Sequence, residues 1–143
     1  MRKFLHTLFI ILFLFPVLHA QVTTAPAVVT ESGAVDIIFD ATQGNKGLMG
    51  YTGDVYAHTG VITNLSTSGS DWKYAPAWGD NSAKYKLTSL GSDKWKLTIS
   101  PDLRSWYGVP AGEQISKLAF VFRSADKTKE GKAAGGADII VTL

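Results

Sequence analysis

Short stretches in which apolar and polar residues alternate recur along the chain. In one of them Val35, Ile37 and Phe39 occupy every second position, the period that is typical of a β-strand with one buried face. The same period predicts further strands over residues 54–58, 84–88, 94–100, 117–123 and 137–143. Turn sequences separate these stretches, among them LGSD at 90–93 and KEGKAAGG at 129–136.

Only the segment SPDLRSWYGV, residues 100–109, departs from this pattern. Ser100 is placed as a helix N-cap, Pro101 at the first helical position and Gly108 as a stop, which predicts one short helix or 3₁₀ turn. About six or seven short strands with turns every eight to twelve residues or so favour an all-β fold. We therefore expect an antiparallel immunoglobulin-like β-sandwich with one short helical turn.

The first residues have the pattern of a targeting segment. An apolar run, LFIILFLFPVL, follows Arg2 and Lys3 and closes at Ala20, which predicts a secretory signal peptide over residues 1–20. The run is too short for a membrane-spanning helix. We expect an exported protein, periplasmic or extracellular, with no membrane span. A loose segment at 21–34 would precede the sandwich at 35–143.

Composition excludes several classes of function. Removing residues 1–20 from the 143 leaves 123, and removing Arg2 and Lys3 from the 14 basic residues leaves 12, equal to the 12 acidic ones. A neutral chain of this kind lacks the basic surface that nucleic acid requires. Cysteine is absent, so disulfides, thiolate metal sites and cysteine nucleophiles are excluded.

Catalytic patterns are missing as well. The chain has no G-x-S-x-G elbow, no H-x-x-x-H spacing and no glycine-rich phosphate loop. A pair of carboxylates across a cleft could serve a glycosidase, but most acidic residues lie at strand edges and turns. We therefore expect no enzyme activity, no metal and no cofactor.

The strand pattern sorts most of the aromatic residues into the core. Trp95 shares a strand face with Leu97 and Ile99, which predicts burial. Phe120 and Phe122 share another face with Leu118, and the same reasoning applies to them. Trp106 and Tyr107 lie in the helical turn, where we expect them to cover the open end of the sandwich rather than bind a ligand.

Trp72 and Trp78 are different, because they lie in the irregular segment DWKYAPAWGDN. They either fold back over an edge of the sandwich or stack on the apolar faces of sugar rings. His58 shares strand parity with Asp54 and Tyr56, which predicts a polar face. Its imidazole is then either solvent-facing or in contact with a ligand.

A strand VYAHTG, a loop closing on tryptophan and a second tryptophan followed by glycine resemble the starch-binding carbohydrate-binding modules of family 25. The longer runs GLMGYTGDVYAHTGVIT, SDWKYAPAWGDN and KWKLTISPDLRSWYGVP resemble the amino-terminal β-sandwich modules of secreted bacterial α-amylases, over about residues 35–143. The resemblance implies a non-catalytic α-glucan binder that holds a glycoside hydrolase near starch or glycogen. Such a chain is either a free-standing module or part of a longer enzyme.

The resemblance also implies which residues bind. His58 and Trp72 match the family motif and would form the sugar platform, with Trp78 a weaker match. Thr59 stands where the family has tyrosine, and KTKEGKAAGG stands where it often has W-D-N-N. Tyr56 is counted with this face, and the neighbouring groups expected to hydrogen-bond sugar hydroxyls are Lys73, Tyr74, Asp80 and Asn81. The alternative hypothesis is a structural spacer or docking sandwich that packs its aromatic surface on a catalytic partner without binding sugar.

Overall fold

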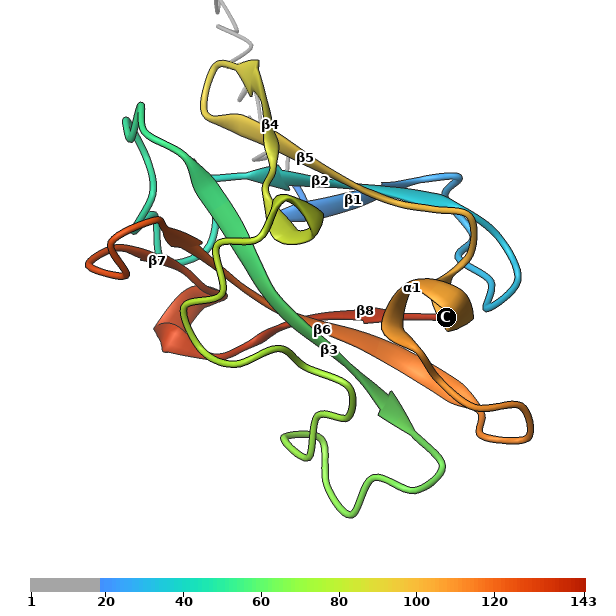
Figure 1. Ribbon diagram of the computed structural model, residues 1–143. Coiled ribbons are helices and arrows are strands. Elements are labelled where there is room, and N and C mark those ends of the chain that lie inside the picture. Colours follow the sequence, from blue (N-terminus) through green and yellow to red (C-terminus); the bar gives the residue numbers. More distant parts are fainter. Residues whose placement is uncertain (1–18) are drawn as a thin grey trace, which may run out of the picture.

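A computed structural model describes residues 19–143, so residues 1–18 of the expected signal peptide lie outside the described residues. Two antiparallel sheets pack face to face (Figure 1), which confirms the expected all-β sandwich. The first sheet contains, in spatial order, β1 (Val22–Ala25), β2 (Val35–Asp40), β5 (Lys94–Ile99) and β4 (Thr88–Gly91). The second contains β3 (Val55–Thr63), β6 (Ile115–Ser124), β7 (Glu130–Gly131) and β8 (Ile139–Thr142), the last two both pairing with β6.

The core lies between the two sheets, where the strand pattern placed it. Phe39 of β2 and Phe122 of β6 stack across the interior with their ring centres 4.3 Å apart. Every second residue of β5 and β6 is buried on this side, as predicted: Trp95, Leu97, Ile99, Leu118 and Phe120. Burial of each such side chain stabilises the fold by about 1.5–3 kcal/mol.

The predicted helical turn is α1 (Leu103–Tyr107), but its N-cap is Asp102 and not Ser100. The Asp102 carboxylate accepts both from the backbone N–H of Ser105 and from its hydroxyl, so it satisfies the first turn better than Ser100 would. Gly108 ends the helix at φ 77°. Trp106 and Tyr107 of this helix are buried, as expected, and belong to the hydrophobic core; α1 itself lies at one end of the sandwich (Figure 1).

Two expectations about strands are wrong. The strand expected at 84–88 is absent over residues 84–87, and Thr88 instead begins β4. In η1 (Ala83–Tyr85) and just after it, the N–H groups of Tyr85 and Lys86 make local turn bonds, and Lys86 makes only an isolated bridge to Tyr56. The segment at 21–34, expected to be loose, contributes β1, which pairs with β2 along its whole length. A second 3₁₀ turn, η2 (Ala134–Gly136), precedes β8. Among residues 19–143 no helix is long and apolar enough to cross a membrane.

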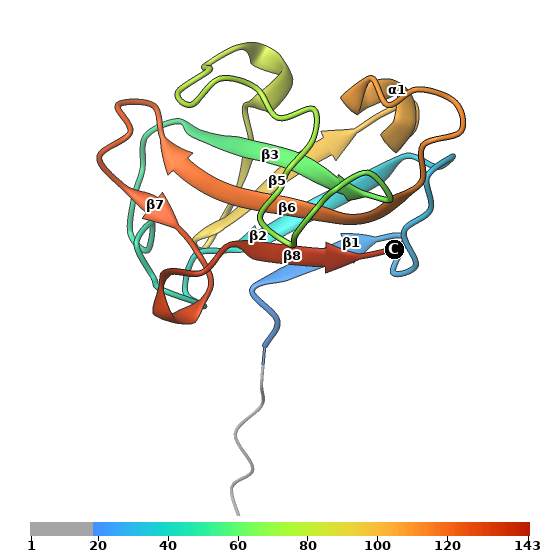
Figure 2. The ribbon, with the colours of Figure 1, turned by 90° about the horizontal axis from the view of Figure 1, so that it is seen from below.

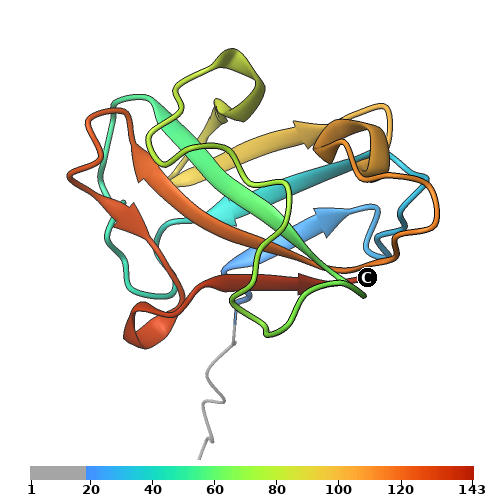
Figure 3. The same ribbon diagram turned by 60° about the horizontal axis from the view of Figure 1, so that its bottom comes forward.

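The strand β3 does not present the polar face that its sequence predicts. All of its residues are buried except His58, which is half-buried. The reason is the segment 64–82, which crosses the outer face of the second sheet (Figures 2 and 3). Lys73 in this segment exchanges two backbone hydrogen bonds with Val61, at 2.8 and 3.0 Å. The segment therefore covers the side of β3 that lies away from the core.

Candidate functional site

Three aromatic rings gather on the outer face of the second sheet. The Trp72 ring stacks on His58 with ring centres 5.6 Å apart, and the Trp78 ring meets His58 edge-on at 4.9 Å. We call these three residues the aromatic cluster. Trp72 and His58 are half-buried, whereas 46% of Trp78 is exposed. The two loop tryptophans predicted to act together are thus brought together through His58, with the Trp78 ring the most open to solvent.

Gly60 allows the covering segment to pack closely against β3. A Cβ there would lie 2.9 Å from the Lys73 carbonyl oxygen and 3.1 Å from the Trp72 Cβ, closer than neighbouring atoms normally approach. The absence of a side chain on Gly60 therefore lets the covering segment lie directly on β3. This contact positions the Trp72 ring over His58.

Arg123 of β6 anchors the segment from below. Its guanidinium is 1% exposed and donates to Asn81 Oδ1 at 2.8 Å and to the Asp80 carbonyl oxygen at 2.6 Å. Its central carbon also lies 5.4 Å from the Tyr56 ring centre and 5.8 Å from that of Trp78. The Arg123 cation thus joins the covering segment to β3, since it hydrogen-bonds Asp80 and Asn81 in the segment and contacts the rings of Tyr56 and Trp78.

Four of the residues predicted to bind ligand have structural partners in the protein. Tyr56 is 7% exposed beneath the covering segment. Asp80 caps a local turn by accepting from the Ser82 N–H, and Asn81 spans Arg123 and the Ala125 carbonyl oxygen. Lys73 forms an ion pair with Asp71 at 3.0 Å. Asp80, Asn81 and Lys73 thus use part of their hydrogen-bonding capacity within the protein, and Tyr56 is buried on β3.

Tyr74 points away from the aromatic cluster to a second anchor. Its hydroxyl donates to Glu113 Oε2 at 2.5 Å, and Thr63 donates to Glu113 Oε1 at 2.5 Å. These two hydrogen bonds hold the pKa of the Glu113 carboxyl below its ordinary value, and the Glu113 bond raises the pKa of Tyr74. Through Glu113, Tyr74 and Thr63 fasten the middle of the covering segment to the end of β3.

Thr59, at the position where the resembled modules have tyrosine, faces the core. It is fully buried, shares a hydrogen bond of 2.7 Å with the Tyr107 hydroxyl and donates to the Ala119 carbonyl oxygen at 2.8 Å. Its side chain therefore does not contribute to the aromatic cluster on the outer face.

The electrostatics of the cluster favour a neutral imidazole. Burial is the main cause that lowers the pKa of His58, and the nearby Arg123 cation lowers it further, while Asp138 acts in the opposite direction. His58 Nδ1 and Trp72 Nε1 are buried without hydrogen-bond partners among the described residues. The described residues contain no group of three or more metal-ligating side chains. The cluster is thus an aromatic surface without a net charge on its rings.

Sequence reasoning missed Arg123 and Glu113. A signal for Arg123 was present in the run LAFVFR, where Ala119 and Val121 make both faces of the strand apolar, a pattern that indicates burial on both sides. A charged residue at the end of such a run is buried and therefore requires hydrogen-bond partners within the protein. Glu113 carries no comparable signal, because it is the last residue of a turn sequence, PAGE.

Comparison with known families finds a match over residues 22–130, to the family described as Domain of unknown function (DUF8578). A comparison with curated proteins finds no match. The matched region runs from β1 through β6 and includes the whole aromatic cluster together with Arg123 and Glu113. Since it covers more than half of the chain, the protein belongs to the DUF8578 family.

Proposed function

We propose that this protein is a non-catalytic module that binds α-glucan, the polymer of starch and glycogen, through the aromatic cluster. The observation that carries the proposal is the Trp78 ring, 46% exposed and held edge-on against His58, which in turn stacks on Trp72. An exposed, fixed indole offers the flat apolar surface that packs on the C–H face of a sugar ring. In this arrangement Trp78 makes the main contact, and His58 and Trp72 support it.

The surrounding charges favour a neutral ligand. Lys73 is paired with Asp71, and the Arg123 guanidinium is buried in bonds to the loop. The covering segment thus directs no unpaired cation at the cluster, and Lys127, which lies beside Gly79, is a nearby cation from outside the segment. Binding should be weak and nearly independent of salt, because ion pairs do not drive it. The proposal extends to an exported module that serves a glycoside hydrolase.

Affinity electrophoresis of residues 21–143 in gels with and without soluble starch tests this function. The wild-type chain should be retarded by starch, and Trp78→Ala should lose that retardation. Leu90→Ala is the matched control, because Leu90 is 50% exposed on β4, away from the cluster. Gels containing a β-linked glucan test the linkage. Equal mobility of wild type and Trp78→Ala in starch would contradict the proposal.

A second candidate function is docking on a catalytic partner. Ile140 of β8 is 42% exposed, and its register with Ala119, itself opposite Gly60, places it on the same sheet face as His58. Trp78 and Ile140 thus leave two large apolar side chains open on one face, as a docking surface would. Sedimentation at increasing concentration distinguishes the functions: self-association that both Trp78→Ala and Ile140→Ser abolish, without starch retardation, favours docking.

A further inference from the structure

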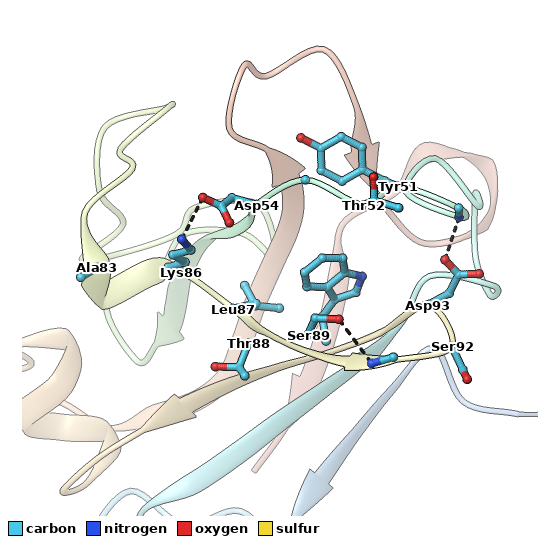
Figure 4. Close-up of a pocket in the computed structure, with 14 residues that line it drawn as sticks. Tyr51, Thr52, Asp54, Ala83, Lys86, Leu87, Thr88, Ser89, Ser92 and Asp93 are labelled. Atoms are coloured by element: carbon cyan, nitrogen blue, oxygen red, sulfur yellow. Dashed lines mark hydrogen bonds and ion pairs between the residues drawn. The ribbon is translucent and has the colours of Figure 1, made fainter.

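A groove separate from the aromatic cluster opens beside the β4–β5 hairpin (Figure 4). Its volume is about 870 Å³, and it lies between the loop 50–54, the segment 86–89 and the turn at 91–93. None of the residues of the aromatic cluster lines it. Since η1 and β4 depart from the predicted strand pattern, this groove could not be predicted from the alternation of residues. We call it the Tyr51 groove.

Two polar contacts fix the walls of the Tyr51 groove. Lys86 Nζ lies 2.8 Å from Asp54 Oδ2, and the Gly50 N–H donates to Asp93 Oδ1 at 2.7 Å (Figure 4). The Asp93 carbonyl oxygen also accepts from the Ala41 N–H at 2.9 Å. The loop 50–54 is thus tied to the opposite wall by contacts at both of its ends, and the groove is formed by the folded chain without a ligand.

Two aromatic side chains line the groove. The Tyr51 ring is half-buried and packs against the core, and Figure 4 places it across the groove from Leu87 and Ser89. Trp95 lines the groove and is 6% exposed, and its Nε1–H is buried with no hydrogen-bond partner among the described residues. An aromatic face beside hydroxyl and charged side chains is a combination suited to a ligand with both apolar C–H faces and hydroxyl groups.

The remaining wall groups restrict the ligand further. Asp54, Asp93 and Lys86 together carry one net negative charge, which disfavours an anion. Thr88, Ser89 and Ser92 also line the groove. Of these, Ser89 lies opposite Trp95 in the β4–β5 pair, and its hydroxyl can both donate and accept. A metal ion has no suitable cage, because the described residues bring together no three metal-ligating side chains. A neutral polyhydroxylated molecule fits all of these groups.

We propose that the Tyr51 groove is a second binding site, which takes a neutral polyhydroxylated ligand of the size of a sugar ring. Tyr51 packs on the apolar face of this ligand, and Asp54, Lys86 and Asp93 hydrogen-bond its hydroxyl groups. The inference goes beyond the proposed function, which uses the aromatic cluster alone, and each of the two sites stands if the other fails.

The ¹H–¹⁵N spectrum of the chain provides a direct test, because each tryptophan indole N–H gives its own signal. Trp95→Phe and Trp72→Phe assign the signals of the groove and of the aromatic cluster. Glucose, maltotriose and cellotriose are then titrated separately. The proposal expects at least one of these sugars to shift the Trp95 indole and the amides of residues 50–54 and 91–93 along a saturating curve. This shift should persist in Trp78→Ala, which removes only the exposed ring of the cluster.

Variants of the groove complete the test. Tyr51→Ala and, as a substitution at an exposed position, Lys86→Ala should each raise the dissociation constant read from the Trp95 signal by about tenfold. Leu90→Ala on the same hairpin, outside the groove lining, should leave it unchanged. The proposal is overturned if no sugar moves the Trp95 indole, or if neither groove variant changes its titration. Movement of the Trp72 signal alone would support the aromatic cluster and reject the groove.

Discussion

The guanidinium carbon of Arg123 lies 5.8 Å from the centre of the Trp78 ring, although the two residues are 45 positions apart in sequence. Trp78 is the most exposed ring of the aromatic cluster, and Arg123 is among the most buried side chains of the protein. The exposed ring therefore rests on a layer that is fixed from below by hydrogen bonds to Asp80 and Asn81. Fixed rings bind with a smaller loss of conformational entropy than mobile ones.

Arg123→Lys tests this anchoring. Lysine keeps the charge but lacks the planar fork that reaches Asn81 and Asp80 together, and the loss of these charge-assisted bonds should lower the free energy of unfolding by about 2–3 kcal/mol. Urea denaturation measures the change. Lys117→Ala, at an exposed position of the same strand, should stay within about 0.5 kcal/mol of wild type. Equal midpoints for Arg123→Lys and wild type would show that Arg123 does not anchor the segment.

Gly60→Ala should displace the covering segment. The new Cβ would lie 2.9 Å from the Lys73 carbonyl oxygen, and overpacking of this kind destabilises by about 1–3 kcal/mol. Because the same contact positions Trp72, the near-ultraviolet circular dichroism of the tryptophans should change as well. Gly69→Ala is the matched control in the same segment, since a Cβ there meets nothing within 4 Å. If both variants behave alike, the close packing at Gly60 is unimportant.

Tyr74→Phe removes one hydroxyl from the second anchor. The Glu113 carboxylate then loses the bond from Tyr74 while keeping the one from Thr63, so the middle of the covering segment should open more easily. Hydrogen exchange of the amides at 71–75 should accelerate, with little change in β5. Because the Tyr74 hydroxyl holds the pKa of Glu113 down, that pKa should rise in the variant. Unchanged exchange at 71–75 would assign Tyr74 no anchoring role.

The free energy of unfolding should decrease as the pH is lowered through the range in which histidine titrates. The pKa of His58 in the folded protein lies below the ordinary 6.5, chiefly because the ring is buried, so as pH falls the unfolded chain takes up the proton first. The stability is therefore complete above 6.5 and decreases as pH falls from there toward the folded pKa. Urea midpoints of residues 21–143 between about pH 7.5 and about pH 5 measure this slope.

His58→Gln is the control for this pH dependence, because residues 21–143 contain no other histidine. The variant should lose the decline between these pH values. The carboxyls with lowered pKa, such as Asp126 at about 2, contribute only at lower pH. A slope that is the same in wild type and His58→Gln would contradict a buried, neutral His58.

Alternation alone predicted the strands that build the core, because β5 and β6 bury every second side chain against the opposite sheet. It failed at residues 84–87. Tyr85 and Leu87 are buried at alternate positions, as in a strand, but Tyr85 lies in a 3₁₀ turn and Leu87 follows the isolated bridge at Lys86. It missed β1, a four-residue edge strand whose residues alternate between partly buried and exposed and in which none is fully buried. Short edge strands carry little of the burial that produces a clear period.

The candidate site was predictable in part. The irregular composition around Trp72 and Trp78 indicated that these rings do not lie in regular strands, and the structure brings both to His58. The polar roles of Tyr74 and Asn81 could not be foreseen, because their partners Glu113 and Arg123 are distant in sequence. The sequence pattern identifies exposed aromatics, while long-range hydrogen bonds decide which polar neighbours remain free.

Isothermal titration calorimetry with maltoheptaose measures directly whether the aromatic cluster binds α-glucan. We predict saturable binding by residues 21–143 that is nearly independent of salt, is abolished by Trp78→Ala and is retained by Leu90→Ala. Circular dichroism of Trp78→Ala should show an intact fold, because nearly half of that side chain is exposed. Absence of heat with the wild-type chain, or equal binding by wild type and a folded Trp78→Ala, would contradict the assignment of the aromatic cluster as an α-glucan site.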